Sequence, residues 1–315
     1  MKLYLGVDGG QSGTAAVIGD ENGRVLGEGE AGPCNHAAAG EGRAKLERAV
    51  TESVSVACTH AGLDARSVHF ESACFGMSGG PEDKREILAA ILRTDRLIVT
   101  TDAVTALAGA TEWGRGIIVI AGTGSIAFGR NAAGKSARAG GWGYVFGDEA
   151  GAFDLVRQSL RAALRMEEGW GPPTSLREVL LGATGARNAN EALHLFYTDD
   201  WPRSRVATLA PLVDQAAMDG DRVAARILTA AAQELATLAA AVRGQLWPDP
   251  DTSLPITNIM STLVEVAYVG GVFQSRSILE RFRALVELEP NVRCQPPLRS
   301  PAEGALLEAI RESEK

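Results

Sequence analysis

Residues 2–14 read KLYLGVDGGQSGT. The apolar residues over 2–7 predict a β-strand, and the glycines after it predict a tight turn into a second strand over 14–19. Glu21-Asn22-Gly23 is a further turn signal, so a third strand is expected over 24–30. Strands joined by such short turns pair antiparallel, and the chain therefore opens with three strands of one sheet.

Helical and strand patterns then alternate along the chain. Helices are predicted over 51–61 and 81–93, and strands over 68–76 and 97–101. Three hairpin-linked strands followed by such alternation favour a mixed sheet covered by helices.

The opening pattern occurs a second time. Residues 116–121 predict a strand, residues 122–125 a glycine turn and residues 126–130 a returning strand. This similarity indicates a duplication in which each half starts with a strand, a glycine turn and a strand. Residues 148–241 are mostly helical and rich in alanine, and a last strand over 264–269 precedes two final helices.

Length and charge limit the classes of function. A chain of 315 residues suits two domains of about 100 to 200 residues each, and two domains imply a cleft. The formal net charge of -8 gives no reason to expect nucleic acid or an anionic membrane as a partner, so a small substrate is expected.

The cysteines and the apolar runs bear on the compartment of the protein. The four cysteines are scattered, without the close pairs of a zinc knuckle, a redox motif or a disulfide framework. No apolar run approaches the roughly 20 residues that are needed to span a bilayer. We therefore expect a cytoplasmic protein with buried thiols.

The first candidate site is the stretch Asp8-Gly9-Gly10-Gln11-Ser12. Consecutive glycines let backbone N–H groups approach phosphate oxygens, and a carboxylate at the end of a strand can hold a hydrated Mg²⁺ ion. A plain hairpin turn is the alternative.

The second candidate site, Gly122-Thr123-Gly124, has the same design in the other half of the chain. Two such loops together indicate that the phosphate chain of a nucleotide is held from both sides. Neither loop is a Walker A motif, because no lysine follows the glycines, and neither shows the dinucleotide-binding fingerprint.

Asp102 is the candidate catalytic base. It follows an apolar strand and precedes the alanine-rich segment 103–110. Phosphoryl transfer to a hydroxyl needs a positioned group that orients the nucleophile and accepts its proton. A helix N-cap is the alternative role for an aspartate at this point.

Two more glycine-rich segments complete the set. Residues 140–151 combine glycines, aromatic residues and acids, as a polyol site requires. Gly270 and Gly271 follow the last predicted strand, where a flat ligand such as adenine can lie close to the backbone. Loop geometry alone also explains both segments.

In this order, the motifs at Asp8, Asp102, Gly122 and Gly270 resemble those of the actin/hexokinase/Hsp70 superfamily. More narrowly, the chain resembles the BadF/BadG/BcrA/BcrD ATPase family and, within it, the N-acetylglucosamine kinases. The residues that carry this resemblance are Asn35-His36, Gly76-Met77-Ser78-Gly79-Gly80, Thr100-Thr101-Asp102-Ala103, Ala121-Gly122-Thr123-Gly124-Ser125, Gly141-Trp142-Gly143 and Gly147-Asp148-Glu149.

The resemblance implies an α/β fold of two ribonuclease H-like domains with mixed sheets flanking a central cleft. Residues 1–115, completed by a helix over 301–315, would form the first domain, and residues 116–300 the second, with a helical insertion. The implied activity is ATP-dependent phosphorylation of a hexosamine, with N-acetylglucosamine and its 6-phosphate favoured. A homodimer is implied as well.

The resemblance also implies a role for each candidate residue. Asp102 would be the base, and Asp8 would organise Mg²⁺. Ser12, Thr123 and the surrounding glycines would hold the phosphates of ATP. The sugar would be contacted by Asn35, Ser78, Asp102, Gly141 and Asp148.

The sequence departs from the family pattern at two positions, and it allows alternative substrates and functions. Many relatives carry glycine in place of Gln11 and a basic residue in place of Gly13, which affects triphosphate binding. Glucosamine or another hexose is the alternative substrate, and a non-catalytic regulatory ATPase module the alternative function. A dehydratase activator is disfavoured, because no cysteine lies between Cys74 and Cys294 to hold an iron–sulfur cluster.

Overall fold

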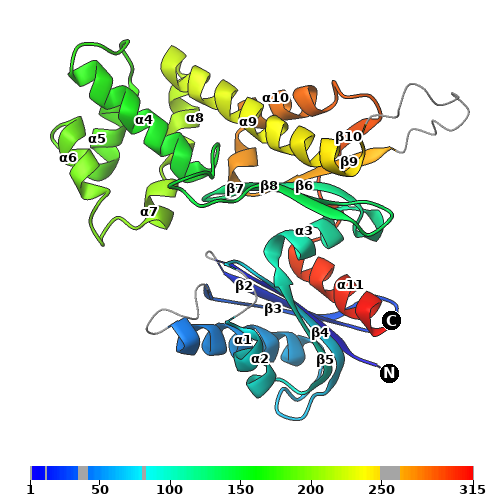
Figure 1. The fold of residues 1–315 in the computed structure, drawn as a ribbon. Helices are drawn as coiled ribbons and strands as arrows, with labels where there is room; N and C mark the ends of the chain where they lie inside the picture. Colours follow the sequence, from blue (N-terminus) through cyan, green and yellow to red (C-terminus); the bar gives the residue numbers. More distant parts are fainter. Residues whose placement is uncertain (1, 11–12, 35–41, 80–82, 249–262, 315) are drawn as a thin grey trace, which may run out of the picture. The chain divides into compact units, whose positions relative to one another are not determined.

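The structure is a computed structural model that describes residues 2–10, 13–34, 42–79, 83–248 and 263–314. The chain divides into two compact units (Figure 1). Unit 1 comprises residues 1–116 and 296–315, and unit 2 comprises residues 117–295.

Unit 1 is built on a five-stranded mixed sheet with the strand order β3-β2-β1-β4-β5. Its strands are β1 (Tyr4–Gly9), β2 (Thr14–Gly19), β3 (Val25–Ala31), β4 (Phe70–Met77) and β5 (Thr94–Thr101). Strands β1, β2 and β3 pair antiparallel, which confirms the predicted three-stranded opening. Strand β4 pairs parallel with β1, and β5 pairs parallel with β4.

Helices cover both faces of this sheet (Figure 1). Helices α1 (Gly42–His60) and α2 (Arg85–Ile91) share a core with Leu5 and Val7 of β1. The intervening residue Tyr4 belongs instead to the cluster formed with α11 (Pro301–Ser313), because successive side chains of a strand point to opposite faces. Asp8 is four residues after Tyr4, so its side chain points to the same face of the sheet, the one that α11 covers.

Helix α3 (Asp102–Ala110) packs against α11 and β4 on that same face. It is followed by a 3₁₀ turn, η1 (Glu112–Gly114), which leads into unit 2. The end of β5 and the beginning of α3 therefore bring residue 102 to the carboxyl edge of the parallel strands.

Unit 2 has a second five-stranded sheet, with the order β10-β9-β6-β7-β8. Its strands are β6 (Gly116–Ala121), β7 (Ser125–Arg130), β8 (Ser136–Gly140), β9 (Val264–Val269) and β10 (Val292–Gln295). Strands β9 and β6 pair parallel, as do β10 and β9, and β8 pairs antiparallel with β7. Read in chain order, the strands of each unit follow the same spatial order, which agrees with the duplication inferred from the two similar openings.

The helical part of unit 2 forms one core with its sheet. Its helices are α4 (Ala152–Glu167), α5 (Leu176–Thr184), α6 (Ala189–Leu195), α7 (Arg203–Ala207), α8 (Ala210–Met218), α9 (Arg222–Leu246) and α10 (Arg276–Val286), with a 3₁₀ turn, η3 (Gly271–Gln274). The proline-rich stretch from Trp247 onward lies largely outside the described residues.

Helix α9 is the longest described helix of unit 2. Among the described helices it is the one that is long and apolar enough, by length and composition, to cross a membrane. Its apolar side chains, among them Leu228, Leu235 and Val242, are buried in the core of unit 2, and the helix packs against β7, β8 and α10. Packing within the unit therefore accounts for its composition.

Candidate functional site

The ends of three parallel strands bring the unit 1 candidates together. In the sheet register Asp8 lies opposite Gly76, and Gly76 lies opposite Thr100. The carboxyl ends of β1, β4 and β5 are thus neighbours at one edge, which is where open α/β sheets bind ligands. Asp8 belongs to the first of these strands, and Asp102 directly follows the last.

Gly76 allows helix α3 to lie against the sheet at this edge. A Cβ atom on Gly76 would lie 2.0 Å from the Oγ1 atom of Thr105, so any side chain there would displace the first turn of α3. The Thr105 hydroxyl in turn donates to the carbonyl of Asp102 at 3.0 Å. The absence of a side chain at residue 76 therefore helps to place Asp102 on the same face as Asp8.

The two carboxyl groups interact electrostatically. Burial raises the pKa of Asp8 to about 7, and the negative charge of Asp102 adds to this shift. Burial also raises the pKa of Asp102, although the Ala103 N–H, which donates to Asp102 Oδ1 at 2.8 Å, works against the shift. Within the described part of the chain neither carboxylate forms an ion pair with a basic side chain.

The N-cap of helix α3 is Thr101, and Asp102 is the first residue of the helix. The carboxylate accepts the N–H of its direct neighbour and not the more distant N–H groups that an N-cap side chain satisfies. The capping role considered from the sequence therefore does not describe Asp102.

The other unit 1 candidates surround the end of β1. The Ser78 N–H donates to the carbonyl of Gly9 at 3.0 Å, and the Gly10 N–H donates to the carbonyl of Gly13 at 2.9 Å. Ser78 and the first glycine loop therefore lie side by side. Three predicted contacts lie outside the described residues, namely Gln11, Ser12 and Asn35, as does His36 beside Asn35.

The donor set of unit 1 fits a magnesium ion shared with phosphates better than a protein-only metal cage. The described residues contain no group of three or more His, Cys, Asp or Glu side chains that could hold a metal ion. Mg²⁺ keeps several waters and binds through one or two carboxylates together with substrate phosphates. Two neighbouring carboxylates without a basic partner, Asp8 and Asp102, match that requirement.

In unit 2 the second glycine loop is fixed by helix α4. The N–H groups of Ala152 and Phe153 donate to the carbonyls of Gly122 and Thr123 at 2.8 and 3.2 Å, and the Gly122 N–H donates to the carbonyl of Gly124 at 3.0 Å. The N–H groups of Thr123 and Gly124 donate to no group in the described residues. They are therefore free for an anionic ligand.

Gly270 lies beside this loop. Strands β9 and β6 are parallel neighbours, and Gly270 follows β9 with a φ of 113°. A Cβ atom on Gly270 would lie 2.3 Å from the carbonyl oxygen of Ala121, the residue before the loop. The structure thus brings Gly122, Thr123 and Gly124 together with Gly270 and Gly271 at one edge of the unit 2 sheet.

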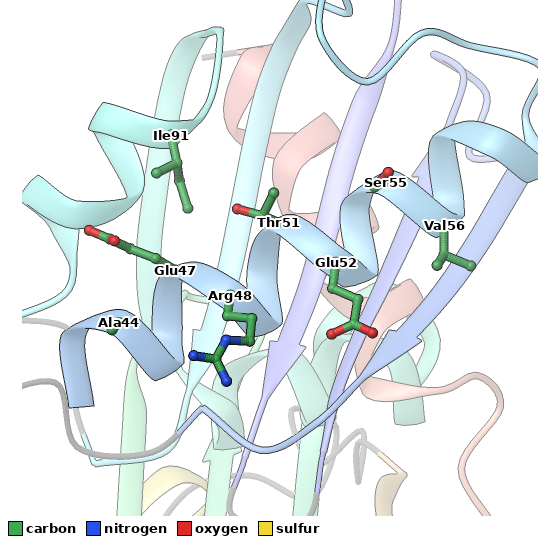
Figure 2. Close-up of a pocket in the computed structure, with 8 residues that line it drawn as sticks. All are labelled: Ala44, Glu47, Arg48, Thr51, Glu52, Ser55, Val56 and Ile91. Carbon is green, nitrogen blue, oxygen red and sulfur yellow. The ribbon is translucent and has the colours of Figure 1, made fainter. Parts of the chain in front are cut away.

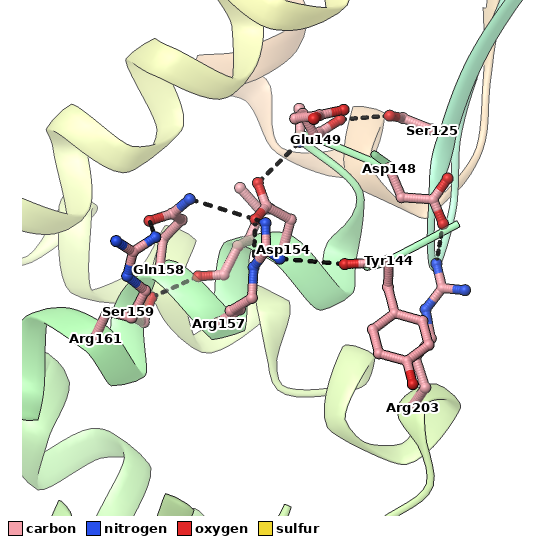
Figure 3. Close-up of polar contacts among 12 residues, drawn as sticks. Ser125, Tyr144, Asp148, Glu149, Asp154, Arg157, Gln158, Ser159, Arg161 and Arg203 are labelled. Atoms are coloured by element: carbon pink, nitrogen blue, oxygen red, sulfur yellow. Dashed lines mark hydrogen bonds and ion pairs between the residues drawn. The ribbon is translucent and has the colours of Figure 1, made fainter. Parts of the chain in front are cut away.

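The loop after β8 carries the predicted sugar contacts Gly141 and Asp148. Gly141 has a φ of 71°, and Asp148, although not a glycine, has a φ of 61°. Asp148 is 8% exposed, and its Oδ2 atom accepts a hydrogen bond from the guanidinium of Arg203 (Figure 3). Nearby, the Ser125 hydroxyl donates to the carbonyl of Glu149, which ties this loop to β7.

Sequence reasoning did not single out Arg203. It lies 55 residues after Asp148, at the start of the short helix α7, and no motif or spacing links the two. Only the packing of the helical segment against the loop brings the arginine to the carboxylate.

A hollow along helix α1 is separate from these candidates. It has a volume of about 680 Å³, and its lining residues are Ala44, Glu47, Arg48, Thr51, Glu52, Ser55, Val56 and Ile91 (Figure 2). The hollow is open to solvent and contains none of the predicted site residues. We therefore assign it no part in the chemistry.

Known proteins resemble this chain over nearly its whole length. It is 30% identical to an N-acetylmuramic acid/N-acetylglucosamine kinase of Clostridium acetobutylicum, over 99% of each chain. It is also 30% identical to an N-acetyl-D-glucosamine kinase of Dictyostelium discoideum, over 98% of each chain. Among solved structures, a putative N-acetylglucosamine kinase from Chromobacterium violaceum matches with a TM-score of 0.77 and 27% identity, over 98% of this chain and 99% of that one.

These likenesses and the two five-stranded mixed sheets confirm the predicted actin/hexokinase fold class. The sequence profile of the BadF/BadG/BcrA/BcrD ATPase family matches residues 5–309, which include every candidate residue described above. The chain belongs to the BadF/BadG/BcrA/BcrD ATPase family.

Proposed function

We propose that the protein is an ATP-dependent N-acetylglucosamine kinase that transfers the γ-phosphoryl group of ATP to the 6-hydroxyl of the sugar. The observation that carries this proposal is the pair Asp8 and Asp102, two neighbouring carboxylates without a basic partner at the carboxyl edge of a sheet. The two relatives that are 30% identical over almost the whole chain, both named as kinases of N-acetylglucosamine, support the substrate.

Asp102 acts as the general base in this proposal. Its pKa lies above the ordinary value because the group is buried, and a base with a raised pKa accepts a proton more readily near neutral pH. As the sugar oxygen bonds to the γ-phosphorus, the bond from that phosphorus to the bridging oxygen of ADP breaks. The hydroxyl proton passes to Asp102, and ADP leaves with the bridging oxygen.

Asp8 would hold the Mg²⁺ ion. When bound, the ion would neutralise negative charge on the phosphates, a task for which the glycine loops contain no lysine. The loss of this carboxylate would leave Asp102 as the remaining acid at the edge of the sheet.

The glycine loops bind ATP. The free N–H groups of Thr123 and Gly124 donate to phosphate oxygens, and Gly270 and Gly271 provide a flat surface for adenine. Further phosphate contacts are proposed from Gly9, Gly10, Gln11, Ser12 and Gly122.

Asn35, Ser78, Gly141 and Asp148 bind the sugar in this proposal. One candidate substrate besides N-acetylglucosamine has specific support, because the clostridial relative is also named as a kinase of N-acetylmuramic acid. The domain bounds 1–115 and 116–300, a homodimer and a cytoplasmic location are further proposals, for which the resemblance to the family is the support.

A substrate panel tests the proposed function. ADP release is measured with Mg²⁺ and ATP against N-acetylglucosamine, N-acetylmuramic acid, glucosamine, N-acetylmannosamine and glucose at equal concentrations. The highest kcat/KM is expected for N-acetylglucosamine. ATP turnover that is the same with and without every sugar would contradict the proposal, and a preference for glucosamine would reassign the substrate.

A further inference from the structure

Arg203, the first residue of the short helix α7, contacts three residues at the candidate site of unit 2. Its guanidinium donates to Asp148, and its carbon Cζ lies 5.2 Å from the ring centre of Tyr144 and 5.7 Å from that of Phe153. Figure 3 shows Arg203 beside Tyr144, pointing toward the carboxylate. The cation is thus held in place by two aromatic rings and one acid.

The ion pair uses only part of the carboxylate. Arg203 contacts Asp148 Oδ2, and Oδ1 accepts no hydrogen bond from any residue of the described part of the chain. A carboxylate accepts hydrogen bonds at both oxygens. One oxygen of Asp148 is therefore fixed by the protein, and the other is available to a substrate hydroxyl.

The same ion pair lies against the second glycine loop. A Cβ atom on Gly124 would lie 2.3 Å from Asp148 Oδ2 and 2.7 Å from the contacting guanidinium nitrogen of Arg203. The backbone of the proposed phosphate loop therefore packs directly on the pair, and it does so because residue 124 has no side chain. A shift of the guanidinium would therefore displace both the loop 122–124 and the carboxylate of Asp148.

The arrangement includes an unsatisfied polar atom. Arg203 Nε is buried and has no hydrogen-bond partner in the described residues. A buried donor without a partner is unfavourable for folding, and such groups in native proteins call for an explanation. We therefore look for the role of Arg203 in the position that its guanidinium takes, and not in stability.

The surroundings of Arg203 show what its removal would do. Together with Tyr144 and Phe153 it lines a cavity of about 500 Å³, whose wall also includes Trp201 and Tyr197. A shorter neutral side chain would connect Asp148 to this space, where water can solvate the acid in several orientations. The carboxylate would then lose its fixed rotamer.

We propose that Arg203 is a positioning residue that holds Asp148 in the orientation in which Oδ1 accepts a sugar hydroxyl, and that also keeps the loop 122–124 in place. The proposal rests on the kinase function proposed above. Arg203 acts on the sugar through Asp148 and touches no reacting atom. Its planar, forked guanidinium suits this task better than the flexible ammonium of a lysine.

The kinetic test compares Arg203→Gln and Arg203→Lys with Arg205→Gln. Arg205 is a matched control, because it lies in the same helix, stacks on Trp201 and donates to the carbonyl of Asp200, without contact to Asp148. For Arg203→Gln we expect KM for N-acetylglucosamine to rise about 10- to 100-fold, the scale of a lost charge-assisted contact, with kcat within about threefold of the parent. The KM of Arg203→Lys should lie between those of the parent and Arg203→Gln. The KM of Arg205→Gln should equal that of the parent.

A double-variant cycle separates positioning from general damage. If Arg203 acts through Asp148, the variant Asp148→Asn with Arg203→Gln should raise KM for the sugar no further than Asp148→Asn alone. Additive effects of the two changes, or an unchanged KM in Arg203→Gln, would overturn the proposal. If Arg203→Gln does not fold, as judged by its melting curve, the cycle is run with Arg203→Lys.

A nucleotide measurement distinguishes failure of this inference from failure of the proposed function. Calorimetry of ADP binding requires no sugar, and the contact with Gly124 predicts a Kd about 3- to 10-fold weaker in Arg203→Gln and unchanged in Arg205→Gln. A parent protein without sugar-dependent ADP release would contradict the kinase function, whereas the ADP titration would still decide whether Arg203 fixes the loop. An unchanged Kd in Arg203→Gln would overturn that part of the inference.

Discussion

The buried carboxylates of the two units differ in whether a basic side chain pairs with them. In unit 1, Asp8 and Asp102 lie near each other without a basic partner among the described residues, and burial raises the pKa of both. In unit 2, Asp148 is paired with Arg203 between two aromatic rings. Both units have the same strand order, so the sheet does not cause this difference.

This difference indicates that the two groups of carboxylates have different roles. Uncompensated carboxylates attract a metal ion and accept protons, which are the tasks of a reaction centre. A carboxylate that is neutralised and fixed in one orientation suits the recognition of a neutral polyol. We therefore propose that the acids of unit 1 carry out the chemistry and that the acid of unit 2 positions the substrate.

The largest expected effect comes from Asp102→Asn. The amide keeps the shape of the side chain but cannot accept the sugar proton, so kcat should fall by roughly 10²- to 10⁴-fold. ADP affinity should hardly change. Steady-state rates at saturating ATP and sugar measure the effect, with a melting curve to verify folding.

Asp95→Asn provides the matched control for this change. Asp95 belongs to the same strand, β5, but is exposed and pairs with His69, away from the carboxyl edge. This variant should retain the parental rate. A folded Asp102→Asn protein with most of its activity would remove the base from the mechanism.

A smaller effect is expected from Gly124→Ala, which tests the contact between the glycine loop and the ion pair. The new methyl group would lie 2.3 Å from Asp148 Oδ2, and the crowding should lower kcat/KM by about 10- to 100-fold, equivalent to about 1 to 3 kcal/mol. Gly182→Ala is the control, because a Cβ atom there also has nothing within 4 Å and the residue belongs to α5, outside the candidate site. Equal melting temperatures and equal kcat/KM values in the two variants would show that the contact at residue 124 does not matter.

The smallest effect concerns the pH dependence of stability in the metal-free protein. The pKa of Asp8 is raised to about 7 in the folded state, from an unfolded value near 3.8. The stability that this group contributes is therefore complete below pH of about 3.8 and is lost as the pH rises through 7. Asp8→Asn cannot ionise and lacks this loss.

Melting curves of the parent and Asp8→Asn between pH 5.5 and 8 measure this contribution. Relative to the variant, the parent should lose about 1 to 2 kcal/mol of stability over this range when no divalent cation is present. Mg²⁺ should stabilise the parent at pH 8 and leave the variant unaffected. Parallel curves with and without Mg²⁺ would contradict the assignment of Asp8.

Local signals explain why much of unit 1 could be predicted from the sequence. The strands over 2–7 and 97–101 are apolar and end at an aspartate, and the structure has β1 and β5 in nearly the same places. Asp8 and Asp102 were found for the same reason, since a carboxylate at the end of a strand is visible in a short stretch of sequence.

Elements that depend on their neighbours were missed. Strand β8, with the sequence SARAG, and strand β10, with VRCQ, are short edge strands with few β-forming residues, and pairing with β7 and β9 makes them strands. Helix α1 begins at Gly42, before the predicted start at residue 51, because Leu46 and Ala49 pack into the core although the residues between them are polar or charged. Arg203 was missed because its partner is distant in the sequence.

The most direct test of the account follows the transferred phosphate. The protein is incubated with ATP, Mg²⁺ and N-acetylglucosamine, the amounts of ADP and sugar phosphate are measured by mass spectrometry, and the phosphorylated position is determined by NMR. We expect one molecule of N-acetylglucosamine 6-phosphate for each ADP, and with Asp102→Asn both products should form more slowly by roughly 10²- to 10⁴-fold. Hydrolysis of ATP to ADP and free phosphate, with no phosphate on the sugar, would contradict it.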